Sequence, residues 1–239
     1  MTHVESVTQA GHAPVAEGNE AAAPAVGVTR PGAAVHTGFD PARHGWSLPN
    51  RFLWGPGGRW TYGLCGGLCY AALDHWAAGL PIPLDQDPTH LRPSLRAYLR
   101  RRQLASMAPR HLAALARWLL MANASAEQRV FAHTVPPLCA ALDSGRPTPL
   151  MLIRTRGLVR PWDNHQVVAH GYWRNPATGA LHLQVYDPNH PRQPVEITLD
   201  PPGEAGSHRL SQSTGEPLRG LFPIGYRPMC PPIASSDHG

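Results

Sequence analysis

The amino-acid sequence predicts an α+β fold, and the order of its hydrophobic patterns is the main reason. From residue 64 to about 144, apolar residues recur every three or four positions, which is typical of amphipathic helices. From residue 147 onward they alternate with polar residues, which is typical of strands. Because the helices precede the strands, we expect an N-terminal helical lobe and a C-terminal antiparallel sheet lobe with a cleft between them.

Each segment has its own start and stop signals. The first helix is expected over 64–79, where Gly79 and Pro81 end it, and the last is expected between a cap at Thr134 and a stop at Gly145. Two more helices are predicted over 91–104 and 111–122. Strands are predicted over 147–154, 165–173, 181–187, 194–200 and 219–227.

The two ends of the chain differ in composition from its middle. Residues 1–35 are rich in Ala, Gly, Val and Pro without helical or strand periodicity, which predicts a disordered tail. Residues 229–239 are predicted to form a second, short tail. We therefore expect one folded domain over residues 36–228.

Composition and charge exclude several classes of protein. Charged residues make up only 15% of the chain, and no apolar run approaches the roughly 18 residues of a membrane helix, so no membrane partner is expected. The net charge is +5, but the arginines are dispersed apart from 100–102, so nucleic-acid binding is not predicted. The first residues lack a secretory signal pattern, which predicts a cytoplasmic location and free thiols.

Cys65 is the first candidate for chemistry, because it stands where a helix is expected to begin. A helix N-terminus carries partial positive charge and free N–H groups, which stabilise a thiolate and an oxyanion. Gly66 and Gly67 follow directly, and the lack of a Cβ allows a substrate backbone to approach. The alternative is that Cys65 is a small buried apolar residue, as many cysteines are.

Cys69, one turn further along, is either a rival nucleophile or a packing residue. A metal site that uses Cys65 and Cys69 needs two more ligands, and the sequence has no C-x-x-C motif to supply the usual spacing. A disulfide between the two cysteines is disfavoured by the geometry of a helix.

A histidine and an aspartate are predicted to lie together on a β-hairpin. If the turn between the strands is centred on Ala177, Asp187 faces Val167, and His165 is its diagonal neighbour on the same face. This expectation depends on the register, because a shift of one residue moves the two side chains to opposite faces. The alternative, which is favoured when each residue is considered alone, is that His165 is a structural histidine and Asp187 a turn residue before Pro188.

Segment 164–172 resembles the catalytic-histidine strand of papain-like cysteine peptidases. The Cys65-Gly-Gly-Leu opening, His165 with two valines after it, and the Asp-Pro-Asn that begins at Asp187 resemble more closely the bacteriocin-leader peptidase branch. Segment 142–153 also resembles the helix, turn and strand before the histidine in that branch.

The opening is also similar to that of bacterial proteins with a Gly-Leu-Cys-Gly-Gly motif. The resemblance covers about 60–228. It implies a papain-like fold with a catalytic triad of Cys65, His165 and Asp187.

The sequence departs from the family pattern in three ways. In the papain pattern the nucleophile is Cys69, whereas in the leader-peptidase pattern the nucleophile is Cys65. We favour Cys65 because the two glycines directly follow this residue. Papain itself has asparagine where this chain has Asp187. Both patterns place a glutamine six residues before the nucleophile as an oxyanion donor, but the corresponding residues here are an arginine and a glycine. Possible substitutes for this glutamine are Trp60, Asn164 and Gln166.

We therefore expect a thiol hydrolase that acts on a peptide or another amide-containing substrate. Cys65 attacks the carbonyl, His165 takes and returns the proton, and Asp187 orients the imidazole, so that no metal or organic cofactor is required. Two alternatives remain. One is a non-catalytic binding module on a degenerate fold, which the missing glutamine favours. The other is amidase-like or transglutaminase-like acyl transfer by the same residues.

Overall fold

The computed structural model describes residues 33–48, 50–54, 60–83, 87–88, 90–201 and 209–232. Its α-helices are α1 (Pro41–His44), α2 (Cys65–Ala77), α3 (Pro93–Ser106), α4 (Pro109–Leu120), α5 (Asn123–Arg129) and α6 (Val135–Asp143). A π-helical turn, Val130–Thr134, joins α5 to α6, and a 3-10 turn covers Pro161–Asp163. None of these helices combines the length and the apolar character that a membrane span requires.

One antiparallel sheet forms the second half of the fold. Its strands follow the order β8-β7-β6-β5-β4-β9, and β1 pairs with the far end of β5. The bounds are β1 (Val35–His36), β4 (Thr148–Ile153), β5 (His165–Arg174), β6 (Leu181–Tyr186), β7 (Val195–Leu199), β8 (Leu210–Gln212) and β9 (Gly220–Pro223). Strands β2 (Phe52–Trp54) and β3 (Trp60–Tyr62) form a separate hairpin.

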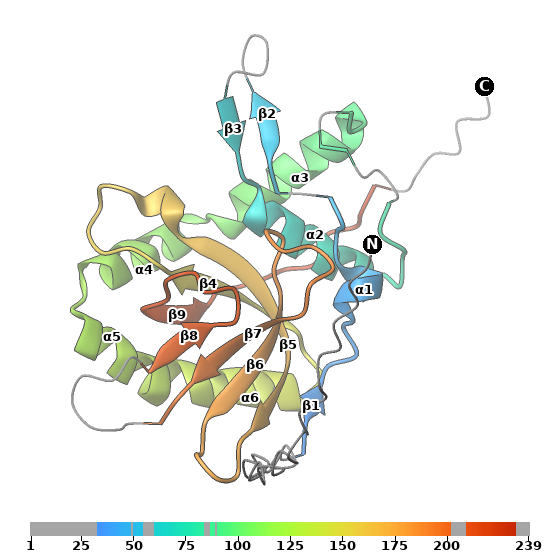
Figure 1. Cartoon of the computed structure of the whole chain (residues 1–239). Helices are drawn as coiled ribbons and strands as arrows, with labels where there is room; N and C mark the ends of the chain where they lie inside the picture. The colour runs from blue at the N-terminus through green and yellow to red at the C-terminus, as the bar shows by residue number, and fades with distance from the viewer. Residues whose placement is uncertain are drawn as a thin grey trace, which may run out of the picture.

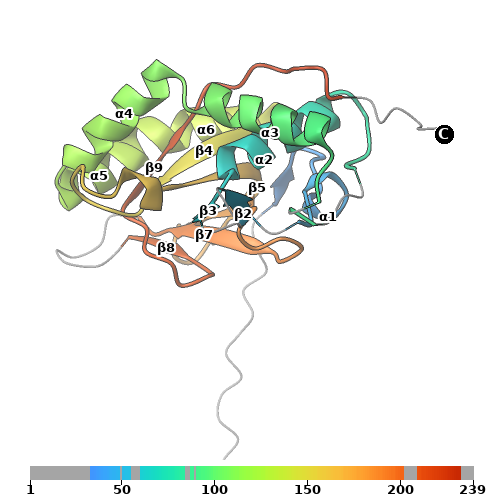
Figure 2. The same ribbon diagram turned by 90° about the horizontal axis from the view of Figure 1, so that it is seen from above.

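The fold is α+β, with helices covering one side of the curved sheet. Figures 1 and 2 show α2 to α6 on that side, whereas β7 and β8 lie farthest from the helices. Helix α2 packs against both α3 and β5. The first turn of α2 therefore lies close to the beginning of β5, where the sequence predicted the nucleophile and the histidine to meet.

The predicted helices and strands are present, with ends shifted by a few residues, but one predicted cap is wrong. Thr134 does not cap α6 with its side chain, because its hydroxyl donates to the Leu221 carbonyl at 3.1 Å. The chain instead enters α6 from α5 through the π-helical turn. Pro136 and Pro137 lack an N–H, so regular α-helical hydrogen bonding cannot continue through this point. The sequence also did not predict α5, β1, β8 or the β2–β3 hairpin.

The hairpin of β5 and β6 contains a β-bulge at His170. Between the bulge and the loop that joins the two strands, Gly171 pairs with Gln184, which is one residue out of the predicted register. On the other side of the bulge, Ala169 pairs with Val185, as the sequence predicted. The bulge therefore absorbs one residue and returns the strands to the register that places Asp187 on the same face as His165.

A buried ionic cluster at Asp74 fixes α2. The carboxylate pairs with Arg102 of α3 at 2.8 Å and accepts hydrogen bonds from the hydroxyls of Tyr98 and Tyr226 at 2.6 and 2.7 Å. It also accepts from the backbone N–H of Met229 at 2.9 Å. Met229, predicted as the first residue of a tail, thus contacts the core, as does Val35 through β1. Residues 1–32 and 233–239 lie outside the described residues.

Candidate active site

Cys65 is the first residue of α2 and is partly buried in the wall of a cavity of about 500 Å³. His165 and Gln166, the first two residues of β5, line the same cavity. Apolar side chains such as Met107, Met151 and Trp162 line it as well. The cavity thus combines a thiol and an imidazole with a mixed polar and apolar lining.

Gly66 and Gly67 have a packing role that the sequence analysis did not predict. A Cβ on Gly66 would overlap the side-chain oxygens of Ser106 and Gln166, and a Cβ on Gly67 would lie 2.5 Å from the Leu99 carbonyl. The glycines therefore allow α2 to approach α3 and β5 closely, rather than exposing the helix to a substrate. The Gly67 N–H also donates to Gln103 at 2.8 Å, so it is not available to an oxyanion.

His165 and Asp187 form a short buried hydrogen bond. Nε2 of His165 lies 2.6 Å from Oδ1 of Asp187, and both side chains are almost completely buried. The same carboxylate oxygen accepts the backbone N–H of Asn189 at 2.8 Å. Because Nε2 faces the carboxylate, Nδ1 is the ring nitrogen that remains for Cys65.

The charges of these groups favour a thiolate beside an imidazolium. Burial alone would raise the pKa of Cys65, but the hydrogen bond and charge of His165, together with the backbone of Gln166 and Gly66, lower it. Burial disfavours the charged ring of His165, but hydrogen bonds with Asp187 and Cys65 and their charges raise its pKa to about 9. For Asp187, burial is outweighed by the His165 ring, and the pKa of the carboxyl is lowered.

Cys69 lies in a different environment from Cys65. It is completely buried, and its thiol is 3.3 Å from the backbone carbonyl of Gln166. Burial, with the charges of Cys65 and Asp187, raises the pKa of Cys69 well above its ordinary value. The neutral thiol is therefore the stable form of Cys69, whereas the environment of Cys65 stabilises the reactive form.

Asn50 is a site residue that sequence reasoning missed. Its Oδ1 accepts the backbone N–H of Leu64, directly before the nucleophile candidate, at 2.6 Å. Its Nδ2 donates to Oδ1 of Asn189 at 2.8 Å, and Asn50 also lines the cavity. A hydrogen-bonded chain thus connects the start of α2, through Asn50 and Asn189, to Asp187. No local sequence signal marks Asn50, because the β2–β3 hairpin separates it from Cys65.

Of the three possible oxyanion donors from the sequence, Asn164 has another role in the structure. Asn164 uses its amide to brace its own loop, donating to the Pro161 carbonyl at 2.8 Å and to Thr155 at 3.3 Å. Gln166 lines the cavity and lies against Gly66, and its buried Oε1 has no hydrogen-bond partner among the described residues, so Gln166 stays a candidate donor. The side chain of Trp60 lies outside the described residues.

Asp187, His190 and Glu216 lie close enough to place three ligand atoms within 4.8 Å of one another. Both oxygens of Glu216, however, pair with the guanidinium of Arg154, at 3.0 and 2.8 Å. Asp187 is in turn engaged by His165. A cation would have to displace these donors, so the cluster fits a hydrogen-bonded network better than a metal centre.

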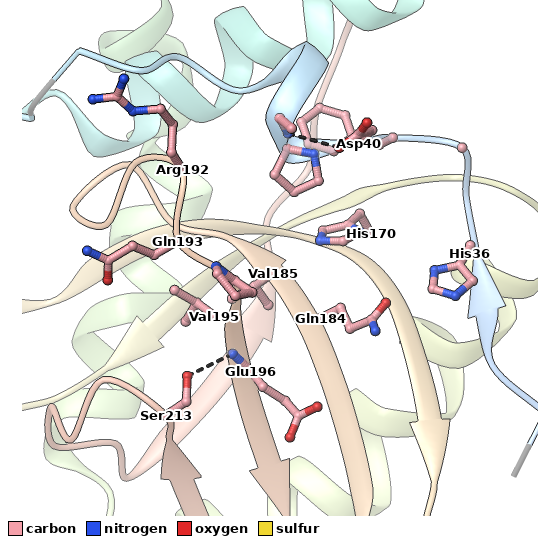
Figure 3. Close-up of a pocket in the computed structure, with 15 residues that line it drawn as sticks. His36, Asp40, His170, Gln184, Val185, Arg192, Gln193, Val195, Glu196 and Ser213 are labelled. Carbon is pink, nitrogen blue, oxygen red and sulfur yellow. Dashed lines mark hydrogen bonds between the residues drawn. The ribbon is translucent and has the colours of Figure 1, made fainter. Parts of the chain in front are cut away.

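A second cavity, of about 790 Å³, is lined by His170, in the middle of β5 (Figure 3). Its lining comes from segment 36–42, from β5, β6 and β7, and from the loops beside them, and it includes His36, His170 and Glu196. Among the described residues, no cysteine lines this cavity. Comparison of the chain with protein-family models, curated proteins and solved structures found no match.

Proposed function

We propose that this protein is a thiol hydrolase that cleaves a peptide or other amide bond on a papain-like α+β scaffold. The observation that carries the proposal is the position of His165. Nε2 of the ring is held by the buried carboxylate of Asp187, and the ring lowers the pKa of Cys65. A nucleophile beside a base that a third group orients is the general arrangement of covalent acyl-transfer catalysts.

The proposed reaction has two steps. The Cys65 thiolate attacks the carbonyl carbon, and His165 then gives its proton to the departing amine, which leaves a thioester on Cys65. In the second step His165 takes a proton from water, and the resulting hydroxide attacks the thioester. The carboxylic acid leaves, and the thiolate and imidazolium are restored.

The oxyanion needs donors other than the glutamine of the family pattern. The backbone N–H of Cys65, at the positive end of α2, is one donor in this proposal. The other is Asn50, whose Nδ2 carries a second hydrogen besides the one bound to Asn189. Asn50 lies beside Gly63, since a Cβ there would be 3.0 Å from Nδ2, and thus next to the start of α2.

The deciding experiment measures alkylation of Cys65 by iodoacetamide at about pH 6, where a free thiol of pKa about 8.5 is almost fully protonated. Peptide mass spectrometry separates labelling of Cys65 from that of the exposed Cys230, which serves as a reference thiol in the same sample. We expect Cys65 to react faster than Cys230, and His165→Ala to remove the difference.

The matched control for this experiment is His170→Ala, which removes another histidine of β5 and should leave the labelling of Cys65 unchanged. Labelling of Cys65 no faster than that of Cys230 would contradict the hydrolase and favour a non-catalytic binding module. If labelling is fast, trapping the acyl group with an added amine in place of water distinguishes acyl transfer from hydrolysis.

A further inference from the structure

Asp187 is held from both sides. Its Oδ1 accepts from His165 and from the Asn189 backbone, whereas its Oδ2 accepts from the side-chain amide of Gln212 at 3.1 Å. Gln212 is the last residue of β8 and is buried. The imidazole therefore depends on a carboxylate whose second oxygen is fixed by a distant part of the chain.

Gln212 is itself fixed by a second carboxylate. Its Nε2 lies 3.4 Å from Oε2 of Glu216, so the same NH₂ group faces Asp187 and Glu216. Oε1 of Gln212 is buried and has no hydrogen-bond partner in the part of the chain that the structure describes. Rotating the amide by half a turn would point this oxygen at two carboxylates. The electrostatics of the two carboxylates thus hold the amide in one orientation.

Glu216 is anchored in turn by cationic and hydroxyl groups. Arg154, directly after β4, binds both of its oxygens, the Thr214 hydroxyl donates to Oε2 at 3.0 Å, and His190 lies 3.2 Å from that oxygen. The backbone N–H of Arg154 also donates to Asn164, the residue before His165. The anchor therefore reaches the loop that carries the histidine.

We propose that Gln212, clamped by Glu216 and Arg154, is a positioning residue that holds the Asp187 carboxylate toward His165. This inference deepens the proposed function and rests on it for its catalytic consequence. Without the amide donor, Oδ2 of Asp187 is left buried and unpaired, and the carboxylate is free to rotate toward His190. The imidazolium of His165 then loses part of its stabilisation.

The test measures the pKa of His165 by NMR titration of the ring carbons, in full-length protein with Cys65→Ala so that the thiol does not contribute. The resonance is assigned by its loss in His165→Gln. Gln212→Met removes the donor at similar volume, and we expect it to lower the pKa of His165 by about one unit. Gln184→Met, a half-buried glutamine on β6 outside this network, is the matched control and should cause no shift.

Glu216→Gln provides a second variant if Gln212→Met does not fold, and it should shift the pKa of His165 in the same direction by a smaller amount. An unchanged pKa in the folded variants would overturn the role of Gln212. With Cys65 restored, Gln212→Met should also slow the alkylation of Cys65 at about pH 6 by roughly tenfold. If the wild-type protein shows no fast alkylation, the hydrolase proposal fails, and the titration still decides whether Gln212 positions Asp187.

Discussion

His165 and His170 lie five residues apart on β5, yet their environments shift their pKa values in opposite directions. Burial disfavours the charged form of both rings. In His165 the carboxylate of Asp187 and the thiol of Cys65 outweigh burial and raise the pKa to about 9. In His170 burial acts together with the charge of His36 and lowers the pKa to about 4. The comparison shows that the partners of a buried histidine, more than its burial, determine whether it carries a charge.

The same contrast applies to the two cavities that these histidines line. The smaller cavity is lined by Cys65 and by the charged imidazole of His165, and the hydrogen-bonded chain of Asn50, Asn189 and Asp187 supports both. The larger cavity is lined by a neutral His170, which packs against Phe39 with ring centroids 6.0 Å apart. The site that we propose to be reactive is therefore not the larger of the two cavities. The predictions below test the contrast between the two histidines of β5.

The largest effect is expected from removing the nucleophile. Cys65→Ala should reduce turnover of any amide substrate by at least about a thousandfold, because the covalent step is lost. Cys69→Ala removes the buried neutral thiol and should retain part of the activity. The measurement is the turnover of both variants at equal concentrations of folded protein. The reverse pattern would make Cys69 the nucleophile.

Asp187→Asn should have the next largest effect. The amide can still accept a hydrogen bond from the ring, but it carries no charge to stabilise the imidazolium. We expect turnover to fall between about ten- and a thousandfold, less than in serine enzymes, because a thiolate depends less on the third residue. The melting temperature should fall as well, because the amide has one acceptor oxygen where the carboxylate accepts from His165, Asn189 and Gln212. Wild-type turnover in this variant would leave a Cys65–His165 dyad without Asp187.

A direct titration of the two histidines is the sharpest check of the comparison. NMR of ring-labelled protein should show one histidine of β5 titrating near pH 9 and the other near pH 4. Each is assigned by its absence in His165→Gln or His170→Gln. Replacing Asp187 with Asn should lower the pKa of His165 and leave that of His170 unchanged. Equal pKa values for the two rings would show that the partners do not determine their charge.

The sequence predicted the local features of this site and missed the tertiary ones. The helix start at Cys65 follows from the periodicity of nearby residues. The juxtaposition of His165 and Asp187 follows from hairpin register, but only because the bulge at His170 compensates for one residue near the turn. A bulge depends on packing on both sides of the strands, so a pairing rule applied to the sequence cannot locate it.

Asn50 and Gln212 illustrate the other limit. Asn50 reaches the start of α2 across an unpredicted hairpin, and Gln212 reaches Asp187 from a strand of three residues in a segment without a strand-like pattern. Both act through single side-chain amides, which leave no periodic signal. Conversely, the sequence analysis singled out Gly66 and Gly67 but interpreted them as giving a substrate access to the helix. The structure shows that the close approach of α3 and β5 requires them, and this tertiary contact cannot be predicted from the local sequence.

The smallest effect concerns the pH dependence of stability, and it tests whether the thiolate and the imidazolium form together. The raised pKa of His165 alone would stabilise the folded state fully below about 6.5, the ordinary value for histidine, and this stability would be lost as the pH rises toward 9. The lowered pKa of Cys65 acts in the opposite direction, because the folded state has already lost the thiol proton. Between about pH 7 and 8.5 the folded pair and the unfolded pair then each hold one proton, so this pair should add almost no slope to the free energy of unfolding. Cys69 and Cys139, whose pKa values burial raises, add the same slope to the wild type and to any variant of the pair, so the test compares slopes.

Cys65→Ala breaks this balance. The folded variant holds one proton more than its unfolded chain wherever His165 is still charged, so its free energy of unfolding should fall as the pH rises, by up to about 1.4 kcal/mol per pH unit. The lowered pKa of Asp187 contributes only at acidic pH and does not affect this range. Urea unfolding at several pH values measures the slope, and the double variant Cys65→Ala with His165→Gln should return to the wild-type slope. If wild type and Cys65→Ala have the same slope, His165 is charged without a thiolate, and Cys65 is an ordinary thiol.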